Sequence, residues 1–198
     1  PPNSVAYAQD DAYELPSTTH VSIVDSQGNA VSMTSSIEMA FGSTVMVNGY
    51  ILNNQLTDFA LSPTKNGKPL ANRVEAGKRP RSSMSPVMVF NKDGSLRLVV
   101  GSPGGSRIIP YVAKTLIAWL DWEMDIQQAI ELPHLANRFG TYDLEKGTPA
   151  EKFAEPLEKL GFTVNIRDLN SGLHGIEITP EGLEGGADTR REGLAIGE

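Results

Sequence analysis

The chain contains no cysteine among its 198 residues. Disulfide bonds, thiolate nucleophiles and cysteine-ligated metals are therefore excluded, although this absence does not identify a cellular compartment. A dense basic run is also missing, and the formal net charge is −7. Because a surface of that sign repels polyanions, we expect no nucleic-acid partner.

Long hydrophobic runs are missing too. The most apolar stretch, residues 108–120, is interrupted by Pro110 and Lys114 and is too short and mixed to cross a bilayer. We therefore expect no membrane span in this chain. The histidines show no paired metal-ligand spacing, so we predict neither a metal site nor another cofactor. These histidines are His20, His134 and His174.

Strand signals dominate the first half of the sequence. Alternating β-branched residues joined by glycine-bearing turns predict hairpins over residues 20–37, 45–52 and 85–100. Between the last two, residues 62–83 hold several prolines, glycines and basic side chains. We expect an irregular functional loop there.

Helix signals follow in the second half. Apolar residues at helical spacing predict a helix that opens after residues 101–106, and a shorter one covers residues 126–132. Thr148 begins a capping-box pattern and predicts a third helix. Residues 162–167 and 175–178 are predicted to pair as closing strands, in one domain of strands, helices and strands.

A pair of threonines stands at the start of the first predicted strand. A threonine hydroxyl within a chain is a poor nucleophile, whereas an N-terminal threonine has its own α-amine as a base. That amine titrates at about 8, which suits a general base. Cleavage of the Ser17–Thr18 bond would therefore activate Thr18, while in an uncleaved chain Thr18 is an ordinary strand-entry residue.

Three polar or glycine-rich segments could bind charged groups. The adjacent Gly104 and Gly105 could direct successive N–H groups at one oxyanion, or they could form a tight turn that caps a helix. Residues 53–58 supply amides and a carboxylate able to grip an ammonium group. Residues 82–86 cluster hydroxyls able to bind a carboxylate, although both segments are also typical of turns.

Taken in order and at these distances, the segments TTH, SIVDSQGNAV, ILNNQLTDF, KRPRSSMSP and GSPGGSRII resemble the small, catalytic subunit of γ-glutamyltranspeptidases. The resemblance runs from Thr18 nearly to the end and includes GGADTRREG. It implies the α+β fold of N-terminal nucleophile hydrolases, a four-layer αββα sandwich with mainly antiparallel sheets. It also implies that residues 1–17 are the tail of the large subunit, and residues 18–198 are a catalytic domain released by self-cleavage.

The resemblance assigns catalytic roles to individual residues. Thr18 matches the nucleophile, and Gly104 and Gly105 match the oxyanion-hole glycines. Thr34 and Ser36 fall on the strand that faces the nucleophile, where the family usually has two threonines. Ser36 departs from that pattern but keeps a hydroxyl that can hydrogen-bond Thr18.

The resemblance also assigns the substrate-binding positions. Ser82 and Ser83 match the pair that holds the substrate α-carboxylate, and Asp58 matches the acid that binds its α-amine. Gln55 matches a further substrate contact. Glu38 replaces the asparagine of many members, and its negative charge favours an α-amino substrate.

The implied activity is hydrolysis or transfer of the γ-glutamyl group of glutathione-like compounds, to water or to amino acid and peptide acceptors. The implied partner is the large subunit of the same precursor, without which we expect little activity, and the implied compartment is the periplasm or the cell exterior. Two alternatives stay open. One is an acylase of the same fold acting on cephalosporin side chains or poly-γ-glutamate, and the other is an uncleaved, non-catalytic binding module.

Overall fold

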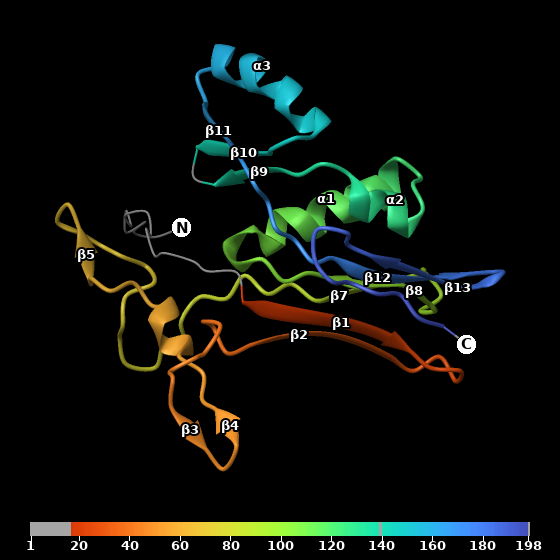
Figure 1. The fold of residues 1–198 in the computed structure, drawn as a ribbon, viewed down its shortest axis with the longest axis horizontal. Coiled ribbons are helices and arrows are strands. Elements are labelled where there is room, and N and C mark those ends of the chain that lie inside the picture. Colours follow the sequence, from red (N-terminus) through yellow and green to blue (C-terminus); the bar gives the residue numbers. More distant parts are fainter. Residues whose placement is uncertain (1–16, 139, 198) are drawn as a thin grey trace. The chain divides into compact units, whose positions relative to one another are not determined.

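The computed structural model describes residues 17–138 and 140–197 (Figure 1). These residues form two compact units, each described separately below. The first holds Ser17 and Ser36–Ser82, and the second holds Thr18–Ser35 and the chain from Ser83 onward. The chain passes from one unit to the other at the Ser17–Thr18 bond. Apart from Ser17, the predicted upstream tail lies outside the described residues.

The second unit is built on a four-stranded antiparallel sheet. Its strands, in order across the sheet, are β13 (Gly182–Ala187), β12 (His174–Thr179), β8 (Leu96–Gly101) and β7 (Val87–Phe90). Residues Leu98, Val99 and Val100 of β8 are fully buried. A continuous apolar run is typical of a strand that is covered on both faces.

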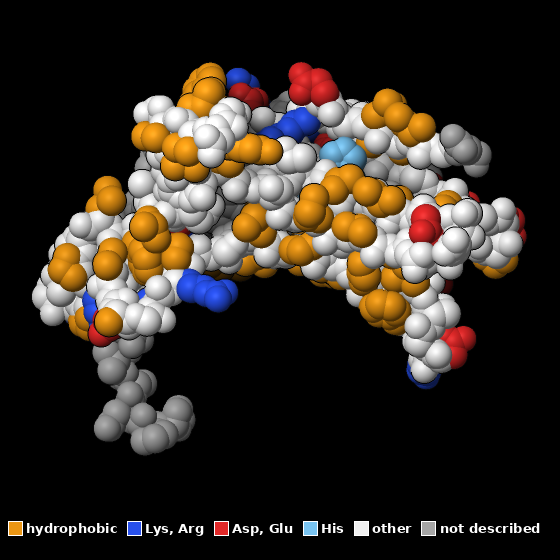
Figure 2. Space-filling view, turned by 90° about the horizontal axis from the view of Figure 1, so that it is seen from below, with side chains coloured by type: hydrophobic (Ala, Val, Ile, Leu, Met, Phe, Trp, Pro, Cys, Tyr) orange, Lys and Arg blue, Asp and Glu red, His pale blue; other side chains and the backbone are white. Residues whose placement is uncertain are grey.

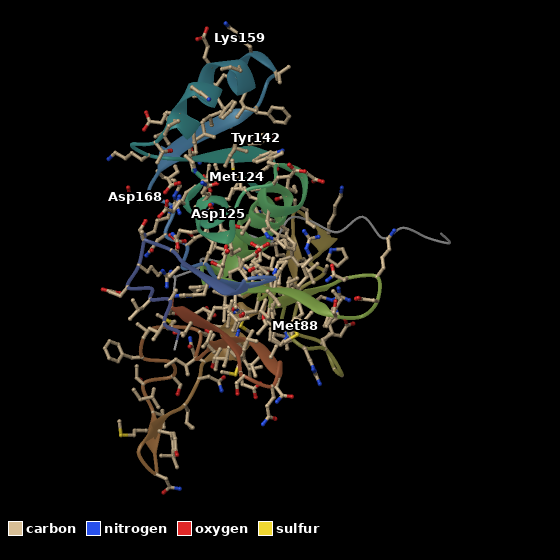
Figure 3. The ribbon with its side chains drawn as sticks, turned by 90° about the vertical axis from the view of Figure 1, so that its right-hand side faces the viewer. Met88, Met124, Asp125, Tyr142, Lys159 and Asp168 are labelled. Carbon is tan, nitrogen blue, oxygen red and sulfur yellow. The ribbon has the colours of Figure 1, made fainter. Side chains whose placement is uncertain are left out.

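Helices cover one face of this sheet and a hairpin covers the other (Figure 1). Helices α1 (Ile108–Asp121) and α2 (Ile126–Glu131) form the first layer, and strands β1 (Thr18–Val24) and β2 (Ala30–Ser36) form the second. These helices and the hairpin confirm the corresponding sequence predictions. Helix α2 begins after Asp125, whose carboxylate accepts the Gln128 N–H at 2.8 Å (Figure 3).

Glycines in the sheet allow the helices to approach closely. A Cβ added to Gly175 would lie 2.8 Å from Ile126 Cγ1, and one added to Gly186 would lie 2.9 Å from Ile130 Cδ1. At these two positions a larger residue would require the helix side chains to move, and Gly186 is one of three glycines in β13, whose sequence is GLEGGA. Glycine is disfavoured in strands, so propensity alone did not predict β13.

A three-stranded sheet completes the second unit. Strand β10 (Thr141–Glu145) pairs with β9 (Leu135–Arg138) in antiparallel fashion and with β11 (Thr163–Arg167) in parallel fashion. The Tyr142 ring packs edge-on against Phe162 at 4.9 Å between centroids, and Figure 3 labels Tyr142 on β10. The predicted pairing of residues 162–167 with 175–178 is wrong, because the first joins β10 and the second joins β8 and β13.

The helix predicted after Thr148 begins as a 3₁₀ turn, η3 (Pro149–Phe153), and continues as α3 (Ala154–Lys159). Thr148 Oγ1 accepts the N–H of Ala150 at 3.2 Å, and Glu151 Oε1 accepts the N–H of Gly147 at 2.6 Å. Both bonds reach one residue earlier than in the expected capping box. The tighter 3₁₀ turn explains this shift.

The first unit consists of short elements. Strands β3 (Met46–Val47) and β4 (Tyr50–Ile51) form the predicted Asn48–Gly49 hairpin, followed by the 3₁₀ turn η1 (Gln55–Asp58). The region predicted as an irregular loop contains a further hairpin, β5 (Thr64–Lys65) and β6 (Lys68–Pro69). Its Asn66–Gly67 turn has φ angles of 52° and 71°. The Asn-Gly dipeptide, which predicted the first hairpin, therefore marks this second hairpin as well, although the sequence prediction did not include it.

Candidate active site

Thr18 is the first residue of β1 and is half-buried. Its carbonyl oxygen accepts a hydrogen bond from Arg191 Nη1 at 3.5 Å. Thr18 thus stands at the start of a strand, which is the position that an N-terminal nucleophile would occupy after cleavage of the preceding bond.

A buried histidine connects β1 with Thr34 on β2. His20 Nδ1 lies 2.8 Å from Thr34 Oγ1, and His20 Nε2 lies 3.1 Å from Ser22 Oγ. The Ser22 hydroxyl donates its only proton to the His174 carbonyl oxygen at 3.3 Å. Ser22 must therefore accept from His20 Nε2–H, which leaves Nδ1 to accept the Thr34 hydroxyl proton.

Burial keeps His20 neutral. Burial, with a smaller contribution from the nearby His174, lowers its pKa to about 4. Because a neutral imidazole has one donor and one acceptor, His20 orients the Thr34 hydroxyl in a single direction. The sequence indicated only that His20 lacks metal-ligand spacing, and it did not connect His20 with Thr34.

The glycine segment between β8 and η2 (Gly105–Arg107) has the backbone form of an anion-binding loop. Gly104 and Gly105 have φ angles of 137° and 61°, which favour glycine. A Cβ on Gly104 would lie 2.8 Å from Tyr111 Cε2, so the position also requires glycine sterically. Successive N–H groups in such a turn, directly before a helix, suit a developing negative charge.

Arg191 brings the surroundings of Thr18 and the glycine loop together. Besides Thr18, it contacts Asn170 twice, from Nε to Oδ1 at 3.0 Å and from Nη2 to the carbonyl oxygen at 3.0 Å. The Asn170 carbonyl oxygen lies 3.8 Å from the position of a Cβ on Gly104. Sequence reasoning assigned no role to Arg191 or Asn170, although Arg191 falls in the quoted segment GGADTRREG.

The first unit carries the remaining predicted residues, with Gln55 and Asp58 in η1. The Gln55 side-chain amide donates to Asp58 Oδ2 in a short contact. Glu38 has a φ of 74°, and its N–H donates to Ser36 Oγ at 2.9 Å. A positive φ costs a glutamate about 1–3 kcal/mol, and such strain clusters at functional sites.

The predicted residues therefore divide between the two units. The second unit holds Thr18, Thr34, Ser83, Gly104 and Gly105. The first holds Ser36, Glu38, Gln55, Asp58 and Ser82.

A second hydroxyl–imidazole–carboxylate group lies in the core of the second unit. His134 Nε2 is 2.6 Å from Ser171 Oγ, and the Ser171 hydroxyl donates to Asp188 in a short contact. Since the only Ser171 proton goes to Asp188, His134 must donate to Ser171 and cannot act as its base. All three side chains are buried, so the group is structural. Burial lowers the pKa of His134 and keeps it neutral.

Within residues 17–138 and 140–197, no group of three or more acidic or histidine side chains is arranged to hold a metal ion. No helix in the same described residues is long and apolar enough to cross a membrane.

Comparison with known proteins identifies the family of this chain. The sequence matches the Gamma-glutamyltranspeptidase family over residues 2–198. The chain belongs to this family. It is 39% identical over 186 residues to the glutathione hydrolase proenzyme of Bacillus subtilis, covering 91% of this chain and 30% of the relative. It is also 34% identical over 188 residues to an Acylase ACY 1 proenzyme of a Pseudomonas species, covering 92% of this chain and 32% of the relative.

A solved structure agrees with this membership. The γ-glutamyltranspeptidase from Pseudomonas nitroreducens complexed with L-DON superposes with a TM-score of 0.78 at 32% identity, covering 91% of this chain and 99% of that chain. The predicted α+β fold of the N-terminal nucleophile hydrolase type, with mainly antiparallel sheets, is therefore confirmed. The chain spans about a third of the length of the curated relatives that it matches.

Proposed function

We propose that this chain is the catalytic part of a γ-glutamyl hydrolase and transpeptidase that acts on glutathione-like compounds. The main support for the proposal is the position of Thr18 at the start of β1, in the same compact unit as the Gly104–Gly105 loop. Arg191 hydrogen-bonds the carbonyl oxygen of Thr18. Relatives named glutathione hydrolase proenzymes support the substrate class.

Activation begins with cleavage of the Ser17–Thr18 bond in the precursor. Cleavage frees the Thr18 α-amine, which titrates at about 8 and can accept the proton of the Thr18 hydroxyl. In this scheme the bond that is cut is also the point where the chain passes between its two units. Residues 1–17 are then the tail of the large subunit and residues 18–198 the catalytic domain.

Thr18 Oγ then attacks the γ-carbonyl carbon of the substrate, and the carbonyl π electrons move to oxygen. The resulting oxyanion accepts hydrogen bonds from the N–H groups of Gly104 and Gly105. Collapse of the tetrahedral intermediate expels the amine, which takes the proton from the Thr18 ammonium group, and leaves an acyl-threonine ester. Attack by water completes hydrolysis, and attack by an amino acid or peptide completes transfer.

The donor is recognised by its amino-acid end. Asp58 pairs with the α-ammonium group, and the Ser82 and Ser83 hydroxyls hydrogen-bond the α-carboxylate. Gln55 contacts the substrate and orients the Asp58 carboxylate through its side-chain amide. Glu38 adds negative charge that favours the ammonium group.

Two hydroxyls orient the nucleophile. Thr34 is held by the neutral imidazole of His20, which fixes the direction of its hydroxyl proton. Ser36, whose Oγ accepts the Glu38 N–H, supplies the second hydroxyl. In this scheme the two hydroxyls would align Thr18 Oγ for attack, and alignment is a large part of catalysis.

The large subunit is the proposed partner. On the outward side of the β1–β2 hairpin, Ile23, Val31 and Met33 are each about half exposed, at 50%, 45% and 51%. Figure 2, drawn from below the view of Figure 1, shows hydrophobic side chains on this side of the protein. An exposed apolar sheet face favours burial by another chain. The family resemblance also favours a periplasmic or secreted location.

An acylase is the second candidate function. It is favoured by the 34% identity to an Acylase ACY 1 proenzyme, and an acylase could use Thr18 and the glycine loop in the same way. A cephalosporin side chain without an α-amine lacks the ammonium group that Asp58 binds in this scheme. Asp58 and Glu38 therefore make this function second to γ-glutamyl transfer.

The test is the intact mass of the full-length precursor over time, beside Thr18→Ala and the matched control Thr19→Ala. We expect a species that begins at residue 18 in the parent and in Thr19→Ala, and none in Thr18→Ala. The processed parent should then release amine from a γ-glutamyl anilide. A folded parent that stays whole would refute self-processing and favour the binding module, whereas a processed parent that cleaves a glutaryl amide faster than the γ-glutamyl amide would favour the acylase.

A further inference from the structure

Asn72 joins the two segments of the first unit that carry the proposed binding groups for the donor amino acid. Its Nδ2–H donates to the Asp58 carbonyl oxygen at 2.6 Å, and its Oδ1 accepts the Arg81 N–H at 3.0 Å. Arg81 directly precedes Ser82. The Asn72 side chain therefore connects Asp58, the proposed ammonium-binding acid, with Arg81, the neighbour of the proposed carboxylate-binding Ser82.

The Asn72 backbone is itself held in place. Its carbonyl oxygen accepts the Ala60 N–H at 2.9 Å, and Ala60 forms a parallel bridge with Arg73. The Arg73 guanidinium donates to the Leu70 carbonyl oxygen at 3.0 Å. Ala60 and Leu70 are buried, so the side chain of Asn72 extends from a fixed point.

We propose that Asn72 is a positioning residue that sets the separation between Asp58 and Ser82, and thereby makes the site selective for donors that carry an α-ammonium and an α-carboxylate. This inference rests on the proposed function. The two charged groups of such a donor are attached to one carbon atom and keep a constant separation. Their binding groups must keep a matching separation, because a displacement of about 1 Å can reduce the rate on the order of 100-fold.

The chemistry of the contact requires an amide. Asparagine presents a donor NH2 group and an acceptor oxygen in one planar group, and both groups are used here. An aspartate keeps the acceptor for Arg81 but loses the donor and turns a carboxylate toward the Asp58 carbonyl oxygen. An alanine removes both bonds and releases the two segments from each other.

The experiment compares Asn72→Ala and Asn72→Asp in the full-length precursor, with Ser62→Ala as a matched control. Ser62 lies in the same unit, and its hydroxyl donates to the Thr64 carbonyl oxygen at 2.8 Å without touching Asp58 or Arg81. The substrates are a γ-glutamyl anilide and a butyryl anilide, which lacks both α-groups. Self-cleavage before Thr18 is measured in every variant.

We expect Asn72→Ala to lower kcat/KM for the γ-glutamyl anilide by roughly 10- to 100-fold, mainly through KM, because the loss of both hydrogen bonds loosens the groups that bind the two charged ends of the donor. Asn72→Asp should lie between Asn72→Ala and the parent. In the Asn72 variants, self-cleavage and the slow butyryl reaction should match the parent, and Ser62→Ala should match the parent in every assay.

Two results would overturn the inference while leaving the proposed function intact. The first is that the parent is active and both Asn72 variants have the same KM for the γ-glutamyl anilide as the parent. The other is a loss in kcat and in self-cleavage as large as the loss in substrate affinity, because this would assign Asn72 to general folding. If Asn72→Ala does not fold, Asn72→Asp decides between these outcomes. A processed parent that ignores the γ-glutamyl anilide refutes the proposed function instead.

Discussion

Substitution of Gly104 by alanine should disable the glycine loop through a contact that the structure defines. The added Cβ would lie 2.8 Å from Tyr111 Cε2 and 3.3 Å from Cδ2, at a φ of 137°. The Tyr111 ring cannot withdraw easily, because it is 2% exposed and its centroid lies 4.1 Å from that of His134. Backbone strain of about 1–3 kcal/mol and overpacking of about 1–3 kcal/mol therefore combine.

The expected result is a loss of about 2–6 kcal/mol in the free energy of unfolding, from these two sources together. Because the loop must move, the Gly104 N–H leaves the oxyanion, and kcat for a γ-glutamyl anilide should fall roughly 10²- to 10³-fold. Urea unfolding gives the first quantity and steady-state kinetics give the second. Both are measured on the processed enzyme.

Gly94→Ala is the matched control. Gly94 also has a positive φ, 86°, but a Cβ there meets nothing within 4 Å. Its substitution should cost about 1–2 kcal/mol from the backbone alone and leave kcat unchanged. A Gly104→Ala enzyme with the stability of Gly94→Ala and full kcat would refute both the steric argument and the oxyanion role of the loop.

Two further predictions concern buried ionisable side chains. Because burial lowers the pKa of His20 to about 4 from an ordinary 6.5, the unfolded chain binds more protons between these values, and stability should fall as pH drops from 6.5 to 4. Urea unfolding at pH 7 and pH 4.5 should show a smaller pH difference in His20→Asn, and an unchanged difference would contradict the assignment. Arg190 donates to Glu145, to Asp188 at 3.1 Å and to the last carbonyl oxygens of α2, so Arg190→Met should cost about 3–5 kcal/mol by leaving buried carboxylates unpaired. The exposed Lys159 pairs with Glu155, and Lys159→Gln should leave the unfolding midpoint unchanged; equal midpoints for the two variants would refute the prediction for Arg190.

Local chemistry made much of the fold predictable. The Asn48–Gly49 turn fixed one hairpin, because this dipeptide tolerates the observed φ angles of 50° and 84°. The spacing of Ile108 and Val112 predicted α1, and both side chains are buried in it. These features depend on residues close together in the sequence.

Strand partners were harder to predict than strands. Residues 163–167 and 174–179 both form strands as expected, but each pairs in a different sheet. The segment between these two strands runs from one sheet to the other, and its side chains Leu169, Ser171 and Leu173 are buried. An alternating pattern identifies the two faces of a strand but does not identify the strand with which it pairs. Pairing therefore depends on the packing of the whole unit.

The same distinction separates the site residues that the sequence predicted from those that it missed. The roles proposed for Thr18, Gly104 and Gly105 depend on properties of the residues themselves: a hydroxyl beside a potential N-terminus, and φ angles that glycine adopts without strain. Arg191 and Asn72 instead act on backbone carbonyl oxygens, those of Thr18 and Asp58. Every residue offers such an oxygen, so no residue type at the receiving end marks the contact in the sequence. The roles proposed for Arg191 and Asn72 therefore become visible only in the folded chain, which brings residue 191 close to residue 18.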